Sequence, residues 1–477
     1  MGHVEGMSRN QRELLAPSLD EIVGAEHPVR VIDAFIDTLD LRAMGFSKVV
    51  PQDMGRPSYR PADLLKLYVY GYANQMRSSR GLEREAARNI ELRWLINRLE
   101  PSFKTIADFR KDHAEAIVEV TRAFRQFCHG CSLHGGELVA IDGTKVEAVA
   151  SRKKVITPKT LAKQIEAIDA RIAGYLKAMD EADRDEAEAQ AEQPKAVAAA
   201  LEKLRLRRDE AEAQAKAMAD QGLTQQVIGE TEARLMKTAR HGHQVAYNAQ
   251  TAVDAKYGLI VAFDLTSDGN DFGQLQPMAE AAKAALEVAA LTVVADTGYS
   301  NGEQGKACAQ ADIVAVVPRP DTVNPRGITL FSRDAFSYDP ASDSWTCPAG
   351  EILGLFKTSQ TQQSRYYTTK ACAGCALKSQ CTTAASRTIA RHFHEEDRQA
   401  MHQRATADPG FMKARRELVE HPYGTMKWLM GYPRFLVRGL KKARAELALI
   451  VMGFNLKRTL NILGVPALLA ALRPQPA

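Results

Sequence analysis

The spacing of apolar residues changes along the chain. In the first 133 residues, apolar positions recur every three or four residues, which is the period of an amphipathic helix. One such run is Leu64, Leu65, Tyr68, Val69 and Tyr72. Pro61 precedes this run, at a position where the first turn of a helix tolerates proline. The pattern predicts a helical region over residues 1–133, and it is typical both of a DNA-binding module and of a plain helical bundle.

Beyond residue 133 the pattern becomes that of strands. Short apolar runs end on Asp142 and Asp296, and residues 243–253 alternate between large and small or polar side chains before a short turn and a second apolar run. The alternating segment and its successor predict a hairpin. The other predicted elements are an Ala-rich helix over 274–288 and a strand over 313–318. A hairpin followed by helices and further strands indicates an α/β fold.

Two segments interrupt this pattern. Residues 156–222 consist mainly of Ala, Glu, Lys, Arg and Gln with apolar residues in heptad spacing, which predicts an antiparallel pair of helices that projects from the fold. We interpret this pair as a solvated arm, and contact with a second arm or a partner is the alternative. Residues 322–395 are rich in Pro, Ser and Thr, with short strands and four of the seven cysteines.

Charge is distributed unevenly. The chain has 477 residues and a net charge of +5, but residues 386–458 alone hold 15 Lys and Arg against 7 Asp and Glu. A basic C-terminal region favours a polyanionic partner, although a solvated helix face fits the charge equally well. No apolar run reaches the ~20 residues of a membrane span, so we expect no membrane association. The polar start of the chain predicts a cytoplasmic protein.

Carboxylates supply the candidate chemistry. Asp142 and Asp296 each end an apolar strand, where α/β sheets present functional groups, although such residues often only cap a turn. Glu420 is a third candidate, within the basic region. If folding gathered the three carboxylates, each pair ~4 Å apart would repel by about 4 kcal/mol unless protons or cations intervened. Oxygen ligands without His or Cys favour Mg²⁺ or Mn²⁺, and two such ions can promote phosphodiester cleavage and transfer.

Several of these motifs occur together in one known family. The segments GRPSYRPADLLKLYVYGY, SSRGLEREAARN, VAIDGTKVEAVASR, VVADTGYSNGE and VEHPYGTMK stand in the order found in the DDE transposases of bacterial insertion sequences. The chain resembles the branch of that family with an E-H-P-[FY]-G-x-x-K signature. Arg416, Glu420 and Lys427 match the family's Arg, Glu and Lys positions, whereas Lys413 stands where the wider family has Tyr.

The resemblance implies a fold, a domain organisation and an activity. It implies an RNase H-like mixed five-stranded sheet flanked by helices over residues 134–477, interrupted by the helical hairpin insertion 156–222 and the Cys-rich insertion 322–395. The helical N-terminal domain 1–133 would then bind DNA. Asp142, Asp296 and Glu420 would be catalytic and would ligate Mg²⁺ or Mn²⁺, with two ions in the family's scheme. The implied reaction is hydrolysis at the transposon ends followed by strand transfer into double-stranded target DNA, with a homodimer assembled on the DNA.

The basic residues near Glu420 would then contact DNA. Arg416, Glu420 and Lys427 share one helix face, which on its own predicts only a weak surface ion pair. In a transposase, this face would bind phosphates. The predicted DNA-binding residues are Arg416, Lys427, Arg434, Arg438, Lys441, Lys442 and Arg444. A nuclease without strand transfer and an inactive DNA-binding protein are the alternative functions.

Four cysteines form a second candidate site. Cys347, Cys372, Cys375 and Cys381 follow the pattern C-x24-C-x2-C-x5-C, which supplies the four thiolates that a tetrahedral zinc ion takes. The final spacing is wider than is common in such sites. A structural zinc ion, an iron–sulfur cluster and free thiols therefore all remain open from the sequence.

Overall fold

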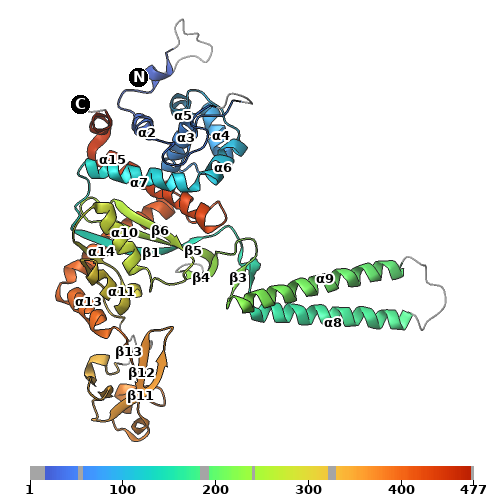
Figure 1. The fold of residues 1–477 in the computed structure, drawn as a ribbon, viewed down its shortest axis with the longest axis vertical. Helices are drawn as coiled ribbons and strands as arrows, with labels where there is room; N and C mark the ends of the chain where they lie inside the picture. The colour runs from blue at the N-terminus through green and yellow to red at the C-terminus, as the bar shows by residue number, and fades with distance from the viewer. Residues whose placement is uncertain (1–16, 52–56, 183–192, 239–241, 321–328, 474–477) are drawn as a thin grey trace, which may run out of the picture.

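The computed structural model describes residues 17–51, 57–182, 193–238, 242–320 and 329–473, without the side chains of 179–182, 193–197, 428 and 429. Figure 1 shows a helical layer that contains the N-terminal region, a central sheet beside it, and two insertions that extend from the sheet in different directions. This order of parts follows the changes of apolar spacing along the sequence.

The central sheet is mixed. Its strands are β1 (Leu138–Glu147), β4 (Arg234–Thr238), β5 (Gly242–Asp254), β6 (Ile260–Thr266), β7 (Leu291–Val294) and β8 (Ile313–Val316). The order β6-β5-β1-β7-β8, antiparallel up to β1 and parallel from β1 to β8, is the five-stranded arrangement expected of an RNase H-like core. The structure adds β4. This strand pairs with the first residues of β5, on the same edge of β5 whose later residues pair with β6.

The two sheet faces bury different helices. Val139 and Ile141 point to the face covered by α10 (Leu275–Leu286) and α11 (Gly302–Gln310). Ala140 points to the opposite face, where it packs with Val419 of α14 (Pro409–Gly424) and with α13 (Glu395–Ala407). Because side chains alternate along a strand, Asp142 points to the same face as Ala140. The strand therefore directs this carboxylate toward α14.

The helical layer is built around the last helix of the chain. Its elements are α1 (Leu19–Ile22), α2 (Pro28–Asp37), α3 (Pro61–Ala73), α4 (Ser79–Arg88), α5 (Ile90–Leu95), α6 (Phe103–Asp112) and α7 (Ala114–Gly130). Helix α15 (Leu440–Leu472) packs against α2, α3 and α7 on one side and against β6 on the other. The N-terminal helices, α15 and part of the sheet thus share one hydrophobic core.

Helix α15 is more apolar over its whole length than any single run of the sequence suggests. Among the described residues, it is the one helix that is long and apolar enough to cross a membrane, but 56% of its most apolar window is buried inside the protein. Its axis breaks at Gly464, whose φ of 74° is not helical, just before Pro466. Its apolar residues therefore serve a core between two layers.

The first insertion is the helical arm. Helices α8 (Pro158–Ala182) and α9 (Gln193–Asp220) pack against each other and extend far from the sheet, as Figure 1 shows. The short strands β2 (Val155–Ile156) and β3 (Gln226–Val227) pair at its base. Buried contacts along the arm come from heptad positions, namely Leu161, Ile168, Leu201, Leu204, Ala211 and Met218. The predicted antiparallel hairpin is present.

The second insertion forms a sheet of its own, which the sequence predicts only in part. Its strands are β9 (Ser337–Asp339), β10 (Ser344–Thr346), β11 (Ile352–Ser359), β12 (Ser364–Thr368) and β13 (Thr388–His392), antiparallel in that order. The turns carry the short helices η4 (Lys370–Gly374) and α12 (Lys378–Cys381). The remaining short helices of the chain are η1 (Arg152–Lys154), η2 (Thr297–Tyr299), η3 (Arg333–Ala335) and the π-helix η5 (Thr425–Leu429).

Candidate active site

The sheet register brings the two aspartates together, although the prediction that the strand ends at Asp142 is wrong, because β1 continues beyond it. Strands β1 and β7 are parallel, and Ala140 lies opposite Val294. Asp142 and Asp296 each follow two residues later; Asp142 remains inside β1, whereas Asp296 lies just beyond the end of β7. A single nitrogen of Arg415, Nη2, lies 2.7 Å from Asp142 Oδ1 and 3.1 Å from Asp296 Oδ2. One cation therefore bridges the two carboxylates.

The two aspartates have different environments. Only 19% of the Asp142 side chain is exposed, against 45% for Asp296. Burial raises the pKa of Asp142 to about 6, Arg415 acts to lower it, and the negative charge of Asp296 adds to the rise. Burial thus disfavours the charged form of Asp142, and the positive charge of Arg415 offsets part of that cost.

A third carboxylate, Asp271, lies beside this pair, and no motif in the sequence marks it. Its Oδ1 accepts hydrogen bonds of 2.7 Å from both Asn248 and Gln250 of β5, and Lys145 Nζ lies 3.5 Å away. A side chain at Gly143 would place its Cβ 2.5 Å from the same oxygen, so the glycine after Asp142 leaves room for Asp271. The signal in the sequence was its position, in the loop between a predicted strand and the Ala-rich helix.

The E-H-P-Y-G-x-x-K motif attaches α14 to β1. The hydroxyl of Tyr423 donates a 2.7 Å hydrogen bond to the carbonyl oxygen of Asp142. Lys427 Nζ donates to Thr144 Oγ1 and, at 2.9 Å, to the carbonyl oxygen of Lys145. Helix α14 runs through Pro422 and continues into η5. The Tyr and Lys of the motif therefore hold the helix against the strand that carries Asp142.

Glu420 is not gathered with the aspartates. Its side chain is exposed, whereas Val419 beside it is buried against the sheet. Among the residues described, no group of three or more His, Cys, Asp or Glu side chains is arranged to hold a metal ion. Glu420 nevertheless lies one turn before Tyr423 on the same helix face, between Tyr423 and Arg415 along the axis. Its role as a third ligand stays a prediction.

The predicted DNA-binding residues do not form one continuous surface of unpaired charge. Arg416, Arg434 and Arg438 are exposed, and Lys442 is half-buried. Lys441 Nζ lies 2.6 Å from Glu115 Oε1, and Arg444 Nε lies 3.0 Å from Asp264 Oδ1. Because both pairs are exposed, each costs little to exchange for a phosphate. DNA contact by these residues stays a prediction.

The four cysteines of the predicted zinc site lie together but far from the aspartates in the fold, in the second insertion. Cys347, Cys372, Cys375 and Cys381 line the same small cavity. The remaining cysteines are Cys128, Cys131 and Cys308, and all seven are free thiols.

The residues at the aspartate pair fit a divalent cation. Two carboxylates already share one positive group, and burial penalises the charge of Asp142 unless a cation compensates it. The Nε of Arg415 is buried and has no hydrogen-bond partner among the described residues, so this arginine is not fully satisfied where it lies. Asp142 and Asp296 are therefore the residues that could hold a metal ion.

Comparisons with known proteins give two family matches, which include neither Asp142 nor Asp296. Residues 17–112 match a family model described as a transposase domain, and residues 346–460 match one described as a transposase DDE domain. No curated protein matches the chain significantly. A cryo-EM structure of a piggyBac transposase synaptic complex with hairpin DNA aligns over 95% of this chain and 87% of that chain, with 7% identity and a TM-score of 0.27. That score is too low to support an argument about the fold.

Proposed function

We propose that this protein, which carries a transposase domain and a transposase DDE domain, is the DNA transposase of an insertion sequence. It would bind the terminal inverted repeats of its element, hydrolyse phosphodiester bonds at the ends and transfer the ends into target DNA. The observation that carries the proposal is the pair Asp142 and Asp296, which lie within and just after two adjacent parallel strands and share one cation.

Asp142, Asp296 and Glu420 would hold Mg²⁺ or Mn²⁺, in a site for two ions. The metal would supply an activated water or 3′-hydroxyl and stabilise the leaving oxygen at phosphorus. Arg415 lies where positive charge is needed between the aspartates, so it would have to leave them for the ions to bind. Freed from the carboxylates, its guanidinium would be placed to bind a phosphate of the DNA.

Glu420 would join the site by a change in α14. Tyr423 and Lys427 hold the C-terminal end of α14 on β1, while Arg415 holds its middle to the two aspartates. Release of Arg415 would leave the helix attached mainly through Tyr423, Lys427 and the apolar contact of Val419. A small rotation of the helix about its axis would then turn the Glu420 face toward Asp142.

DNA would reach this site along the basic C-terminal region. Exposed Arg416 lies on the Glu420 face, and Arg434, Arg438, Lys441, Lys442 and Arg444 would contact phosphates further along. We propose that two protomers assemble on the paired ends and that the protein acts in the bacterial cytoplasm, at the nucleoid. A zinc ion on the cysteines is a separate proposal, because those residues lie in the second insertion.

The test is nicking of DNA that carries the element's terminal repeats, in Mg²⁺ or Mn²⁺. We expect Asp142→Asn, Asp296→Asn and Glu420→Gln each to abolish nicking, while salt-sensitive DNA binding persists. Glu417→Gln is the matched control, because Glu417 is also exposed on α14 and should retain activity. Full nicking by all three variants would refute the site. Nicking without joining of pre-cleaved ends would identify a nuclease instead, and binding without nicking by the wild type would identify a DNA-binding protein.

A further inference from the structure

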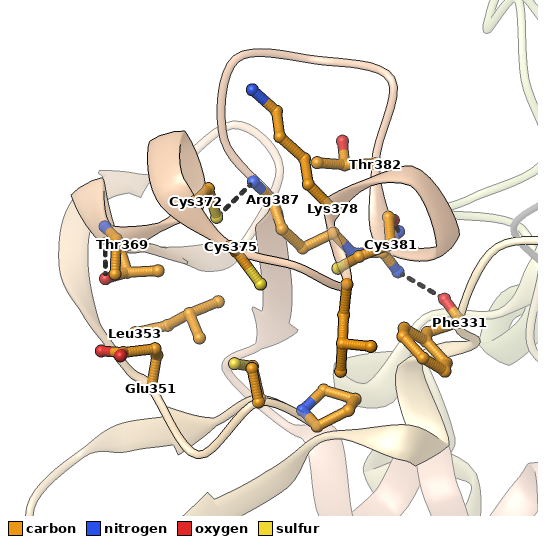
Figure 2. Close-up of a pocket in the computed structure, with 15 residues that line it drawn as sticks. Phe331, Glu351, Leu353, Thr369, Cys372, Cys375, Lys378, Cys381, Thr382 and Arg387 are labelled. Carbon is orange, nitrogen blue, oxygen red and sulfur yellow. Dashed lines mark hydrogen bonds between the residues drawn. The ribbon is translucent and has the colours of Figure 1, made fainter.

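The cysteine-bearing insertion contains a second metal centre, according to its geometry. We propose that Cys347, Cys372, Cys375 and Cys381 bind one structural Zn²⁺ ion that fixes the turns of this insertion. All four line one cavity of about 20 Å³, which is the size of a single water molecule or ion. Figure 2 shows Cys372, Cys375 and Cys381 around this cavity.

The chain brings the four thiols from two separate turns. Cys347 directly follows β10 and begins a tight turn, in which the Gly350 amide donates to the Cys347 carbonyl oxygen at 2.9 Å. Cys372 and Cys375 lie in and just after η4, and Cys381 ends α12. A cysteine turn between two strands that faces a C-x2-C turn is a common way to present four thiolates to zinc.

Arg387 contacts two of the four cysteines. Four thiolates around Zn²⁺ carry a net charge of −2, which requires compensation. The backbone amide of Arg387 donates to Cys372 Sγ at 3.4 Å, a contact that Figure 2 also shows near the cavity. The guanidinium of Arg387 is fixed by the carbonyl oxygens of Cys381, at 2.9 Å, and Phe331, at 3.1 Å. Lys378 also lines the cavity, but Figure 2 shows its amino group pointing away from the sulfurs, so Arg387 is the positive side chain beside them.

The insertion needs such a link because its own core is small. Its buried cluster consists of Phe336, Trp345, Leu353, Tyr367, Cys381 and Ile389. A unit of this size with so few buried residues is usually stabilised by a disulfide or a metal ion. The four cysteines are free thiols, and no three of the described ligand side chains already stand in metal-binding geometry. Binding would therefore turn the four side chains inward toward the cavity that they line.

The ion would also affect the active site indirectly. The insertion enters and leaves the fold beside α13, where Arg333 Nη1 lies 2.6 Å from Glu395 Oε1 and the His392 amide donates to the same carboxylate at 2.9 Å. Helix α13 leads directly into α14, which carries Arg415 and Glu420. An insertion fixed by zinc would hold the start of α13 in place.

The test is metal content of the full-length protein, measured by mass spectrometry without DNA, so the result does not depend on transposition. We expect one zinc per chain, and release of that zinc when a mercurial reagent modifies the thiols. The double variant Cys372→Ser/Cys375→Ser should lose the zinc. Cys131→Ser is the control, because this half-buried cysteine also belongs to a C-x2-C pair but lies in the helical layer, and it should keep the zinc.

Cobalt substitution gives a second readout on the wild-type chain, in case the double variant does not fold. Co²⁺ bound by four thiolates should give the intense visible absorption of a tetrahedral site, and added Zn²⁺ should remove it. Folded wild-type protein that contains no zinc and takes up neither ion would overturn the proposal. Iron with visible absorbance, or zinc retained by the double variant, would overturn it as well.

Discussion

Asp142 should reduce the stability of the metal-free protein, and Asp142→Asn should therefore be a stabilising change. Asn has nearly the shape of the protonated carboxyl and carries no charge. The pKa of Asp142 is raised from 3.8 to about 6, first by burial. A group with a raised pKa favours the folded state fully below pH 3.8, and this contribution is lost as the pH rises through 6. The cost of the charge is thus greatest at neutral pH.

The size of the effect follows from the shift. Each pKa unit corresponds to 1.36 kcal/mol, so ionised Asp142 costs about 3 kcal/mol at pH 7.5. At pH 5 the group is largely protonated in the folded protein, and the cost falls to about 1.5 kcal/mol. We therefore expect Asp142→Asn to raise the free energy of unfolding by about twice as much at pH 7.5 as at pH 5.

Urea unfolding followed by circular dichroism, with EDTA present, measures this difference. Asp108→Asn is the matched control, because the Asp108 side chain is exposed on α6 and the substitution should have little effect at either pH. Adding Mg²⁺ should stabilise the wild type and not the Asn variant. A variant that is less stable than the wild type at pH 7.5, or equally stabilised at both pH values, would refute the assignment of Asp142 as a buried carboxylate that needs a cation.

Three further predictions concern α14 and α15. Arg415→Gln should strengthen Mn²⁺ binding to the free protein by about 5-fold, in line with ~1 kcal/mol for a partly exposed ion pair. Calorimetric titration measures this affinity, and weaker binding would mean that Arg415 does not occupy the cation position. Gly453→Ala should destabilise the protein by about 1–3 kcal/mol, because its Cβ would lie 3.2 Å from the backbone of α3. Gly424→Ala, with no atom within 4 Å of the added carbon, should raise the melting temperature slightly yet weaken DNA binding if DNA approaches there.

The sequence predicted the parts of the site that depend on local pattern. The apolar runs before Asp142 and Asp296 form adjacent parallel strands, although β1 continues past Asp142 to Glu147, and the heptad spacing marks the helical arm. The fold class followed from the order of these elements. In these cases, the local pattern indicates which strand, or which face of a helix, is buried.

The sequence did not predict partners that come from distant segments. The sequence places Arg415 only within a basic region. Its contact with two aspartates cannot be predicted there, because it depends on how α14 lies across the sheet. Asp271 was missed because its loop shows no period. Lys427 was assigned to DNA, whereas the structure places its amino group on β1. Each of these outcomes depends on which face of an element packs inward.

The core around α15 has a consequence for truncated forms of the chain. The match to an N-terminal transposase domain ends at residue 112, but the helices of that region surround α15, which begins at Leu440. A shortened product that stops before Leu440 would expose the apolar faces of α2, α3 and α7 and lose its central helix. Such a product would therefore be prone to aggregation and proteolysis, although it keeps the whole segment that matches the N-terminal transposase domain.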